Sequence, residues 1–176
     1  GSEMCIRDST FSGWSRTEAF EMPARDIVIE GSYKINSYTV TYKVDGEQYG
    51  ETETYEYGAA VTLREKPSRE GYTFKGWSYE NGFKMPAGDV VIEGSYKINS
   101  YTVTYKVDGQ QYGEPEVYKY NELVRLKSEP IKEGYTFSHW NYGEDFLMPA
   151  KDVVIEGSFG INSYTVTYKV DGVQYG

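Results

Sequence analysis

The sequence is poor in the residues that most catalytic and metal-binding sites need. Its 176 residues contain one cysteine and one histidine, too few for a disulfide framework or a His/Cys metal site. No apolar run approaches the roughly 18 residues of a membrane-spanning helix. The formal net charge is −9 and no basic stripe is present, which disfavours nucleic-acid binding. We therefore expect no cofactor, no metal, no nucleic-acid partner and no membrane insertion of this segment.

One stretch of sequence is used three times. It reads IVIEGSYKINSYTVTYKVDG at Ile27–Gly46, VVIEGSYKINSYTVTYKVDG at Val90–Gly109 and VVIEGSFGINSYTVTYKVDG at Val153–Gly172. The copies are 63 residues apart (90 − 27 = 63; 153 − 90 = 63). A period just above the usual repeat range predicts a tandem array of small, self-contained domains.

Each copy of the repeat has β-type patterning. Apolar residues alternate with polar ones over Tyr38–Val44, as in a half-buried strand. Asp45-Gly46 then favours a tight hairpin turn. Ala59–Leu63 fits a short strand or one helical turn, which leaves a β-rich α+β fold open beside a mainly β one. The other strands that we expect are Tyr49–Tyr57, Tyr72–Trp77 and Val90–Tyr96.

The boundaries between modules follow from side-chain parity. Apolar residues lie at even positions over Val90–Ile98 and at odd positions over Tyr101–Val107. An unbroken strand cannot change faces in this way, so the boundary falls at Asn99-Ser100. The predicted full repeats are 36–98 and 99–161. Residues 10–35 are then the C-terminal part of a truncated repeat, and residues 162–176 the first strand of another.

The first nine residues depart from the repeat. Met4–Ser9 (MCIRDS) matches neither equivalent segment of the later copies, and agreement returns at Thr10-Phe11. The hexapeptide also resembles a translated transposase-end adapter from a sequencing library. We therefore treat residues 1–9, including Cys5, as an assembly scar outside the native protein. The absence of other cysteines is compatible with an exported protein that has no disulfides.

Few residues are candidates for chemistry. His139 stands where the other copies have glycine, without a second ligand, and we expect an exposed loop residue. Glu51, Glu53 and Glu56 are interpreted as a solvated strand edge. The variable loops 78–84 and 141–147 share only a tyrosine and a phenylalanine. The candidate ligand contacts are therefore Tyr79, Phe83, Tyr142 and Phe146. Trp77, with Phe74 and Tyr72, could form an aromatic platform, but an aromatic strand in so small a module is more often core.

The motifs EGYTFKGW (Glu70–Trp77), MPAGDVVIEGSYKIN (Met85–Asn99) and YTVTYKVDG (Tyr101–Gly109) resemble the internalin-type B repeat, also called the Listeria–Bacteroides repeat. The resemblance covers Thr10–Gly176. It implies a small β-grasp-like antiparallel sheet in each module, a location on the bacterial cell surface, an adhesin-like or spacer role, and no enzymatic activity. The chain departs from the motif at His139, where the family has glycine.

Three functions remain open at this point. Near-identical modules joined by only one or two residues predict a semi-rigid stalk. We expect a monomeric array in which each compact module measures roughly 25–30 Å across. Alternatively, each repeat offers a weak site for a glycan or a host protein. The repeats could also flank an enzyme domain that lies elsewhere in the protein.

Overall fold

The computed structural model describes residues 8–175 of the chain. Cys5 and most of the Met4–Ser9 segment lie outside this range. The chain divides into two compact units. Unit 1 comprises the residues up to Ser68 together with Phe74–Lys97, and unit 2 comprises Arg69–Thr73 together with the residues from Ile98 onward.

The described residues contain strands and no helix, so the mainly β prediction is confirmed and the α+β alternative is not. The segment that sequence left open, Ala59–Leu63, forms a single antiparallel bridge from Ala60 to Lys84. No helix capable of crossing a membrane occurs in the described part of the chain.

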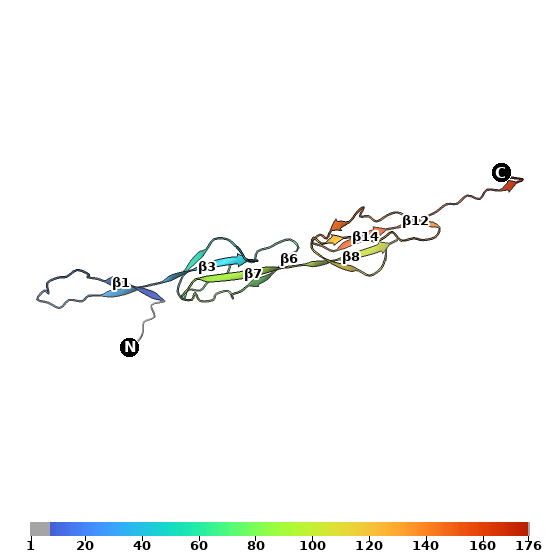
Figure 1. The fold of residues 1–176 in the computed structure, drawn as a ribbon. Coiled ribbons are helices and arrows are strands. Elements are labelled where there is room, and N and C mark those ends of the chain that lie inside the picture. Colours follow the sequence, from blue (N-terminus) through green and yellow to red (C-terminus); the bar gives the residue numbers. More distant parts are fainter. Residues whose placement is uncertain (1–7, 176) are drawn as a thin grey trace. The chain divides into compact units, whose positions relative to one another are not determined.

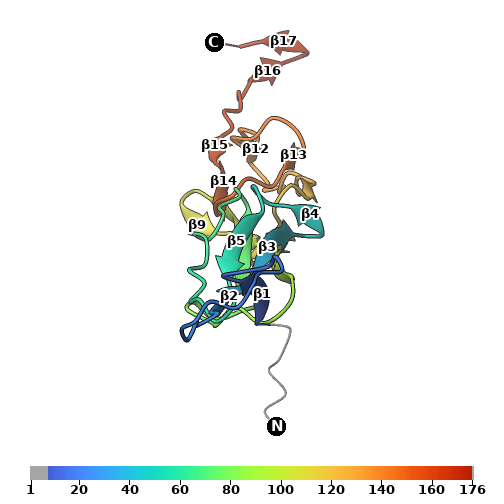
Figure 2. The ribbon, with the colours of Figure 1, turned by 90° about the vertical axis from the view of Figure 1, so that its left-hand side faces the viewer.

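The central sheet of unit 1 has five strands (Figure 1). Their order is β4-β3-β7-β6, and β5 pairs with the other end of β3, on the side of β4. Figure 2 shows β3 beside β5. The bounds are β3 Ser37–Val44, β4 Glu47–Gln48, β5 Glu53–Glu56, β6 Tyr72–Trp77 and β7 Val90–Ile98.

The sheet is mixed rather than wholly antiparallel. The two central strands β3 and β7 run parallel, with Val40 opposite Val90 and Tyr42 opposite Ile92. The hairpin strands β4 and β5 add to β3 in antiparallel fashion. A parallel central pair with antiparallel neighbours is the arrangement of a β-grasp-like sheet, here without a helix in the described residues.

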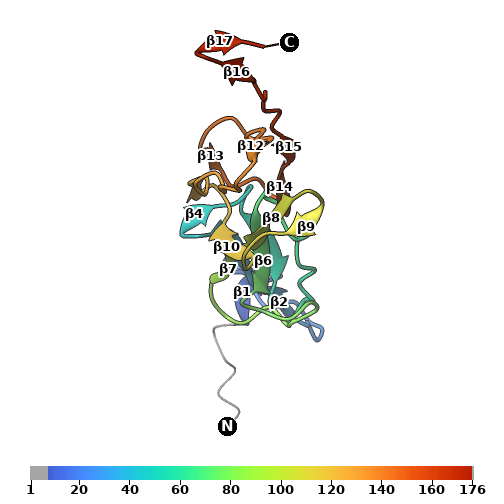
Figure 3. The same cartoon turned by 90° about the vertical axis from the view of Figure 1, so that its right-hand side faces the viewer.

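Unit 2 has a similar central sheet, of four strands, in which Figure 3 labels β8, β9 and β10. The strand β8 pairs with β9 and β10 on one side and, in parallel, with β14 on the other. Two further pairs, β11–β13 and β12–β15, complete it. The bounds are β8 Ser100–Val107, β9 Gln110–Gln111, β10 Glu116–Lys119, β11 Leu123–Val124, β12 Tyr135–Phe137, β13 Phe146–Leu147, β14 Val153–Gly157 and β15 Phe159–Ile161.

The remaining strands belong to the partial repeats. β1 (Ser9–Trp14) pairs with β2 (Gly31–Ile35), with a bulge between Phe11 and Gly13. β16 (Lys169–Val170) and β17 (Val173–Gln174) form a hairpin. These strands correspond to the second half and the first half of a module, and most of their apolar side chains are exposed.

The hairpin turn predicted at Asp45-Gly46 is present. Both residues have positive φ, 50° and 89°, the backbone of a type I′ turn, and Asp108 repeats it with φ 50°. The predicted return strand Tyr49–Tyr57 is interrupted, because only Glu47–Gln48 and Glu53–Glu56 pair with β3. In the second copy Pro115, which has no amide donor, lies in this interruption.

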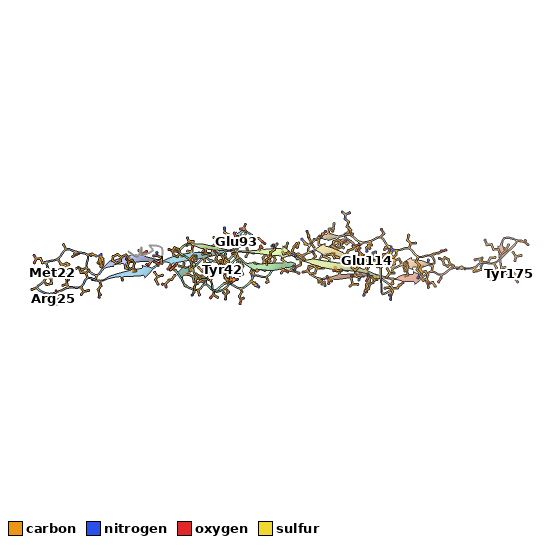
Figure 4. The ribbon with its side chains drawn as sticks, turned by 90° about the horizontal axis from the view of Figure 1, so that it is seen from below. Met22, Arg25, Tyr42, Glu93, Glu114 and Tyr175 are labelled. Carbon is orange, nitrogen blue, oxygen red and sulfur yellow. The ribbon has the colours of Figure 1, made fainter. Side chains whose placement is uncertain are left out.

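Each unit has its own core on one face of its sheet. In unit 1, Val40, Tyr42 and Ile92 have no exposed surface. Their equivalents in unit 2, Val103, Tyr105 and Ile155, are at most 1% exposed. These buried residues are the ones that alternation assigned to one face of each strand. Figure 4 places Tyr42 within the side chains of unit 1 and Glu93 on its outer margin.

Candidate functional site

The predicted contact residues form one aromatic pair in each unit. The rings of Tyr79 and Phe83 are 4.5 Å apart at 40°. The rings of Tyr142 and Phe146 are 4.4 Å apart at 32°. The shared Tyr and Phe of the variable loops therefore lie side by side in both units, although the loops differ in sequence.

The two pairs are only partly available to a ligand. Tyr79 is 40% exposed, whereas Phe83 packs against the core of unit 1. Tyr142 and Phe146 both pack against the core of unit 2. The pairs therefore contribute to packing, and Tyr79 keeps an exposed surface, while ligand contact stays a prediction.

Hydrogen bonds fix both loops to the neighbouring segment. The Leu63 amide donates to Asn81 Oδ1 at 2.8 Å, and the Leu126 amide donates to Asp145 Oδ1 at 2.9 Å. Asn81 and Asp145 are not equivalent positions (81 + 63 = 144), so a shift of one residue preserves the same acceptor. In unit 1, the Val61 amide also donates to the Phe83 carbonyl at 2.9 Å. The pairs are therefore held on fixed loops.

A second cluster in unit 1 joins a charged pair to the sheet. Arg64 Nε lies 2.6 Å from Glu53 Oε1, and its two terminal nitrogens donate to the carbonyls of Tyr49 and Glu51 at 2.8 and 2.6 Å. The Tyr55 hydroxyl donates to Glu53 Oε2 at 2.9 Å. Glu53 is half-buried, so the solvated-edge interpretation was wrong for this residue.

Unit 2 contains the same cluster with lysine in place of arginine. Lys127 Nζ lies 3.1 Å from Glu116 Oε1, and the Tyr118 hydroxyl donates to Glu116 Oε2 at 2.8 Å. The indole nitrogen of Trp140 donates to the Lys127 carbonyl, as that of Trp77 does to Arg64, each at 2.9 Å. A sequence signal existed, since both copies keep a base, a glutamate and a tyrosine at these positions.

The tyrosines of these clusters are held in their neutral form. Burial, followed by the hydrogen bond to Glu53, raises the pKa of Tyr55 to about 12. Burial and the hydrogen bond to Glu116 raise the pKa of Tyr118 to about 12. Burial also raises the pKa of Tyr42 and Tyr105. A phenol with a raised pKa stays protonated at neutral pH, so the Tyr55 and Tyr118 hydroxyls act as hydrogen-bond donors in these clusters.

His139 is exposed, as expected, and has φ 82°. The equivalent glycines, Gly13 and Gly76, have φ 109° and 118°. Within residues 8–175, no three His, Cys, Asp or Glu side chains approach closely enough to hold a metal ion.

Comparison with known proteins defines the class of the chain. The family model of the Listeria-Bacteroides repeat domain matches residues 38–91 and 101–156, one match in each full repeat. The chain therefore belongs to the Listeria-Bacteroides repeat family, which confirms the resemblance carried by the EGYTFKGW and YTVTYKVDG motifs.

The relatives are long proteins of which this chain matches a part. A putative Gly-rich membrane protein of Evansella cellulosilytica is 29% identical over 92% of the chain and 22% of the relative. Internalin H of Listeria monocytogenes is 33% identical over 72% of the chain and 26% of the relative. The chain thus spans about a quarter of the length of these relatives.

Solved structures are more distant. Domains 3–4 of the Streptococcal High Identity Repeats in Tandem (SHIRT) of a cell surface protein are 13% identical. The match covers 71% of this chain and 98% of that one, with a TM-score of 0.31.

Proposed function

We propose that these repeats form a non-catalytic, semi-rigid spacer segment of a bacterial cell-surface protein. Membership of the Listeria-Bacteroides repeat family and the similarity to internalin H support this proposal. The extracellular location and the monomeric state of the array are parts of the same proposal.

The observation that carries the proposal is the shortness of the connection between repeats. β7 ends at Ile98 and β8 begins at Ser100, so Asn99 alone separates two strands that belong to successive repeats. β2 and β3 are likewise separated by Asn36 alone. Each of these strands is paired within its own sheet. A connection of one residue between them therefore allows the joint few conformations, unlike a flexible linker.

The strand register limits the length that one repeat adds. Val40 lies opposite Val90 within unit 1, and Val103 is the equivalent of Val40 in the next repeat. The chain from Val90 to Val103 has 13 steps (103 − 90 = 13). At the strand rise of about 3.4 Å per residue these span about 45 Å. The expected rise per repeat therefore lies between the roughly 25–30 Å width of a compact module and about 45 Å.

Small-angle scattering of chains with increasing repeat number tests the spacer role. We would insert one, two and four further copies of Asn99–Ile161 and measure the maximum dimension. A semi-rigid spacer predicts linear growth by a constant increment in this range. Growth with the square root of repeat number would contradict it, because that is the behaviour of a flexible chain.

Weak multivalent binding is a second candidate, favoured by the recurrence of the aromatic pairs. Tyr79 offers an exposed ring on a loop that is fixed by hydrogen bonds, a geometry suited to stacking on a sugar. The partner proposed here is a host glycan or glycoprotein, bound through several repeats at once. Accessory repeats beside an enzyme domain are the third candidate, because the chain spans about a quarter of the length of its relatives and a fold alone does not define an activity.

Binding to immobilised glycans and mucin distinguishes the second candidate from the first. The double variant Tyr79→Ser, Tyr142→Ser should abolish avid binding if the pairs are the sites. Val117→Ser is the matched control, because Val117 is 70% exposed and lies on β10, in neither of the two loop sequences. Equal binding by the double variant and this control would contradict the glycan hypothesis.

A further inference from the structure

A short segment of one sequence repeat belongs structurally to the unit of the next. Arg69–Thr73, which includes the first two residues of β6, lies inside the predicted repeat 36–98, yet it is part of unit 2. Within unit 2 it contacts Asn99 and Tyr120, which belong to the repeat 99–161. Unit 2 is therefore completed by residues that the preceding repeat supplies.

The packing of Tyr120 explains why this segment contains glycine. Gly71 is buried with φ 74°, and a Cβ at this position would overlap the ring of Tyr120. The rings of Tyr72 and Tyr120 also meet edge to face, with centroids 6.0 Å apart. This position therefore favours glycine for two reasons: its φ is positive, and the ring of Tyr120 occupies the space that a Cβ would need.

Asn99 ties the two sides of this contact together. Its amide donates to the Gly71 carbonyl at 2.9 Å, and its own carbonyl accepts from the Tyr120 amide at 2.9 Å. Its Oδ1 accepts from Thr73 Oγ1 at 2.6 Å. Asn99 therefore binds both the segment Gly71–Thr73 of the preceding repeat and Tyr120, the residue that follows β10.

The same groups occur 63 residues later, but among the described residues no tyrosine ring packs on the glycine. The Asn162 amide donates to the Gly134 carbonyl at 2.9 Å, and Thr136 Oγ1 donates to Asn162 Oδ1 at 2.7 Å. Gly134 has φ 76°, close to the value of Gly71, but nothing lies within 4 Å of where its Cβ would be. We call Gly134, Tyr135, Thr136 and Asn162 the open docking surface, and Gly71, Tyr72, Thr73 and Asn99 the occupied one.

We propose that the open docking surface binds the tyrosine of a further copy of this repeat, at the position of Tyr120. The partner is specified by the occupied surface, where the same residue types hold Tyr120 through ring packing on glycine and a hydrogen bond from its amide. Docking of this kind couples the stability of each repeat to its neighbour. The inference concerns how repeats join, and it holds whether or not the array serves as a spacer.

The two glycines provide a matched test in the full chain. Gly71→Ala and Gly134→Ala introduce the same methyl group at nearly the same positive φ, so the backbone cost cancels in the comparison. Only Gly71→Ala collides with a tyrosine. We expect the melting temperature of unit 2, followed through Trp140, to fall about 4–8 °C further in Gly71→Ala, as for a loss of about 1 kcal/mol in a small domain.

Two further measurements keep the proposal falsifiable. In a Tyr120→Ala background the difference between the two glycine variants should vanish, as in a double-mutant cycle. In a chain extended after Gly176 by a copy of Glu114–Ile161, Gly134→Ala should become as damaging as Gly71→Ala. Equal melting temperatures for the two variants in the present chain would overturn the proposal, and so would a mild Gly134→Ala in the extended chain.

If Gly71→Ala does not fold, a tyrosine comparison replaces it. Tyr120→Ala should destabilise the chain more than Tyr57→Ala, because Tyr57, its equivalent in the first repeat, is 42% exposed and the position equivalent to Gly71 is Asp8. Equal destabilisation by the two tyrosine variants would count against the docking surface.

Discussion

The repeats 36–98 and 99–161 build the same sheet from sequences that differ at informative positions. The six residues of β6 run through Gly76 to Trp77, whereas the three residues of β12 end at Phe137, two residues before His139. Both positions have positive φ, which costs little for glycine and more for a residue with a Cβ. Histidine therefore adopts a positive φ at the position of the glycine, and the paired strand is shorter in its copy, so the surrounding fold constrains this backbone whichever residue is present.

A second difference concerns the charged cluster. Arg64 contacts the Glu53 carboxylate and two carbonyls, whereas Lys127 contacts Glu116 and, at 3.5 Å, the Glu114 carbonyl. The planar guanidinium provides more donors in fixed directions than an ammonium group. Both nevertheless lie over a buried tyrosine ring, at 4.8 Å for Arg64 and 4.6 Å for Lys127. The position requires a cation, and arginine satisfies more of the surrounding acceptors.

The largest expected effect comes from the cores, which are equivalent. Ile92→Ala should destabilise unit 1, and Ile155→Ala unit 2, each by about 2–5 kcal/mol, because both side chains have no exposed surface. Urea denaturation followed through Trp77 or Trp140 alone, with Trp14 and the other of the two replaced by Phe, measures each unit. A loss below about 1 kcal/mol in either variant would contradict the equivalence of the cores.

Substitution of the positive-φ residue at position 76 or 139 should give the next largest effect. Gly76→His should destabilise unit 1 by about 1–2 kcal/mol, and His139→Gly should stabilise unit 2 by a similar or smaller amount, since a Cβ at left-handed φ is strained. The melting temperatures of the two variants, compared with that of the unchanged chain, measure both effects. If His139→Gly lowered the melting temperature, His139 would have a stabilising role that its exposed side chain does not reveal.

Exchange of the cations should give a smaller effect. Arg64→Lys should cost unit 1 about 0.5–1.5 kcal/mol through lost hydrogen bonds to the carbonyls of Tyr49 and Glu51. Lys127→Arg should leave unit 2 unchanged or more stable. Urea midpoints at low and high salt measure both. A strong salt dependence would show that the ion pair, rather than the carbonyl contacts, carries the difference.

The smallest effect is expected at alkaline pH and should be alike in the two units. The pKa of Tyr55 and of Tyr118 is raised to about 12 in the folded state, above the ordinary value of 10. The neutral form is therefore favoured by folding. Its contribution is complete below pH 10 and is lost as the pH rises from 10 through 12.

Urea midpoints between pH 9 and 12 measure this loss. Tyr55→Phe and Tyr118→Phe should each flatten the alkaline decline of their own unit. An unchanged decline in both variants would mean that other groups cause it.

The sequence predicted the local features of the fold well. Alternation over Tyr38–Val44 identified the residues that are buried, because a strand fixes side-chain direction with period 2. Asp45-Gly46 identified the turn, and the change of parity identified the strand break at Asn99. These features depend on neighbouring residues alone.

Features that depend on distant segments were not predictable in the same way. The parallel pairing of β3 with β7 joins residues 50 positions apart, as Val40 and Val90 show, and no local pattern specifies it. The burial of Glu53 depends on Arg64, which folds back onto it. The aromatic pairs were found because two copies of one loop could be compared, but their partial burial depends on the core beneath them.

The most direct test of the spacer account is the distance between equivalent sites in successive repeats. Glu47 and Gln110 are exposed, equivalent residues next to the hairpin turns, and they can be changed to cysteine and spin-labelled after Cys5→Ser. A semi-rigid joint predicts one narrow distance distribution, centred between about 25 and 45 Å. A broad distribution that fills this range and extends beyond it would contradict the account, because the repeats would then be freely jointed.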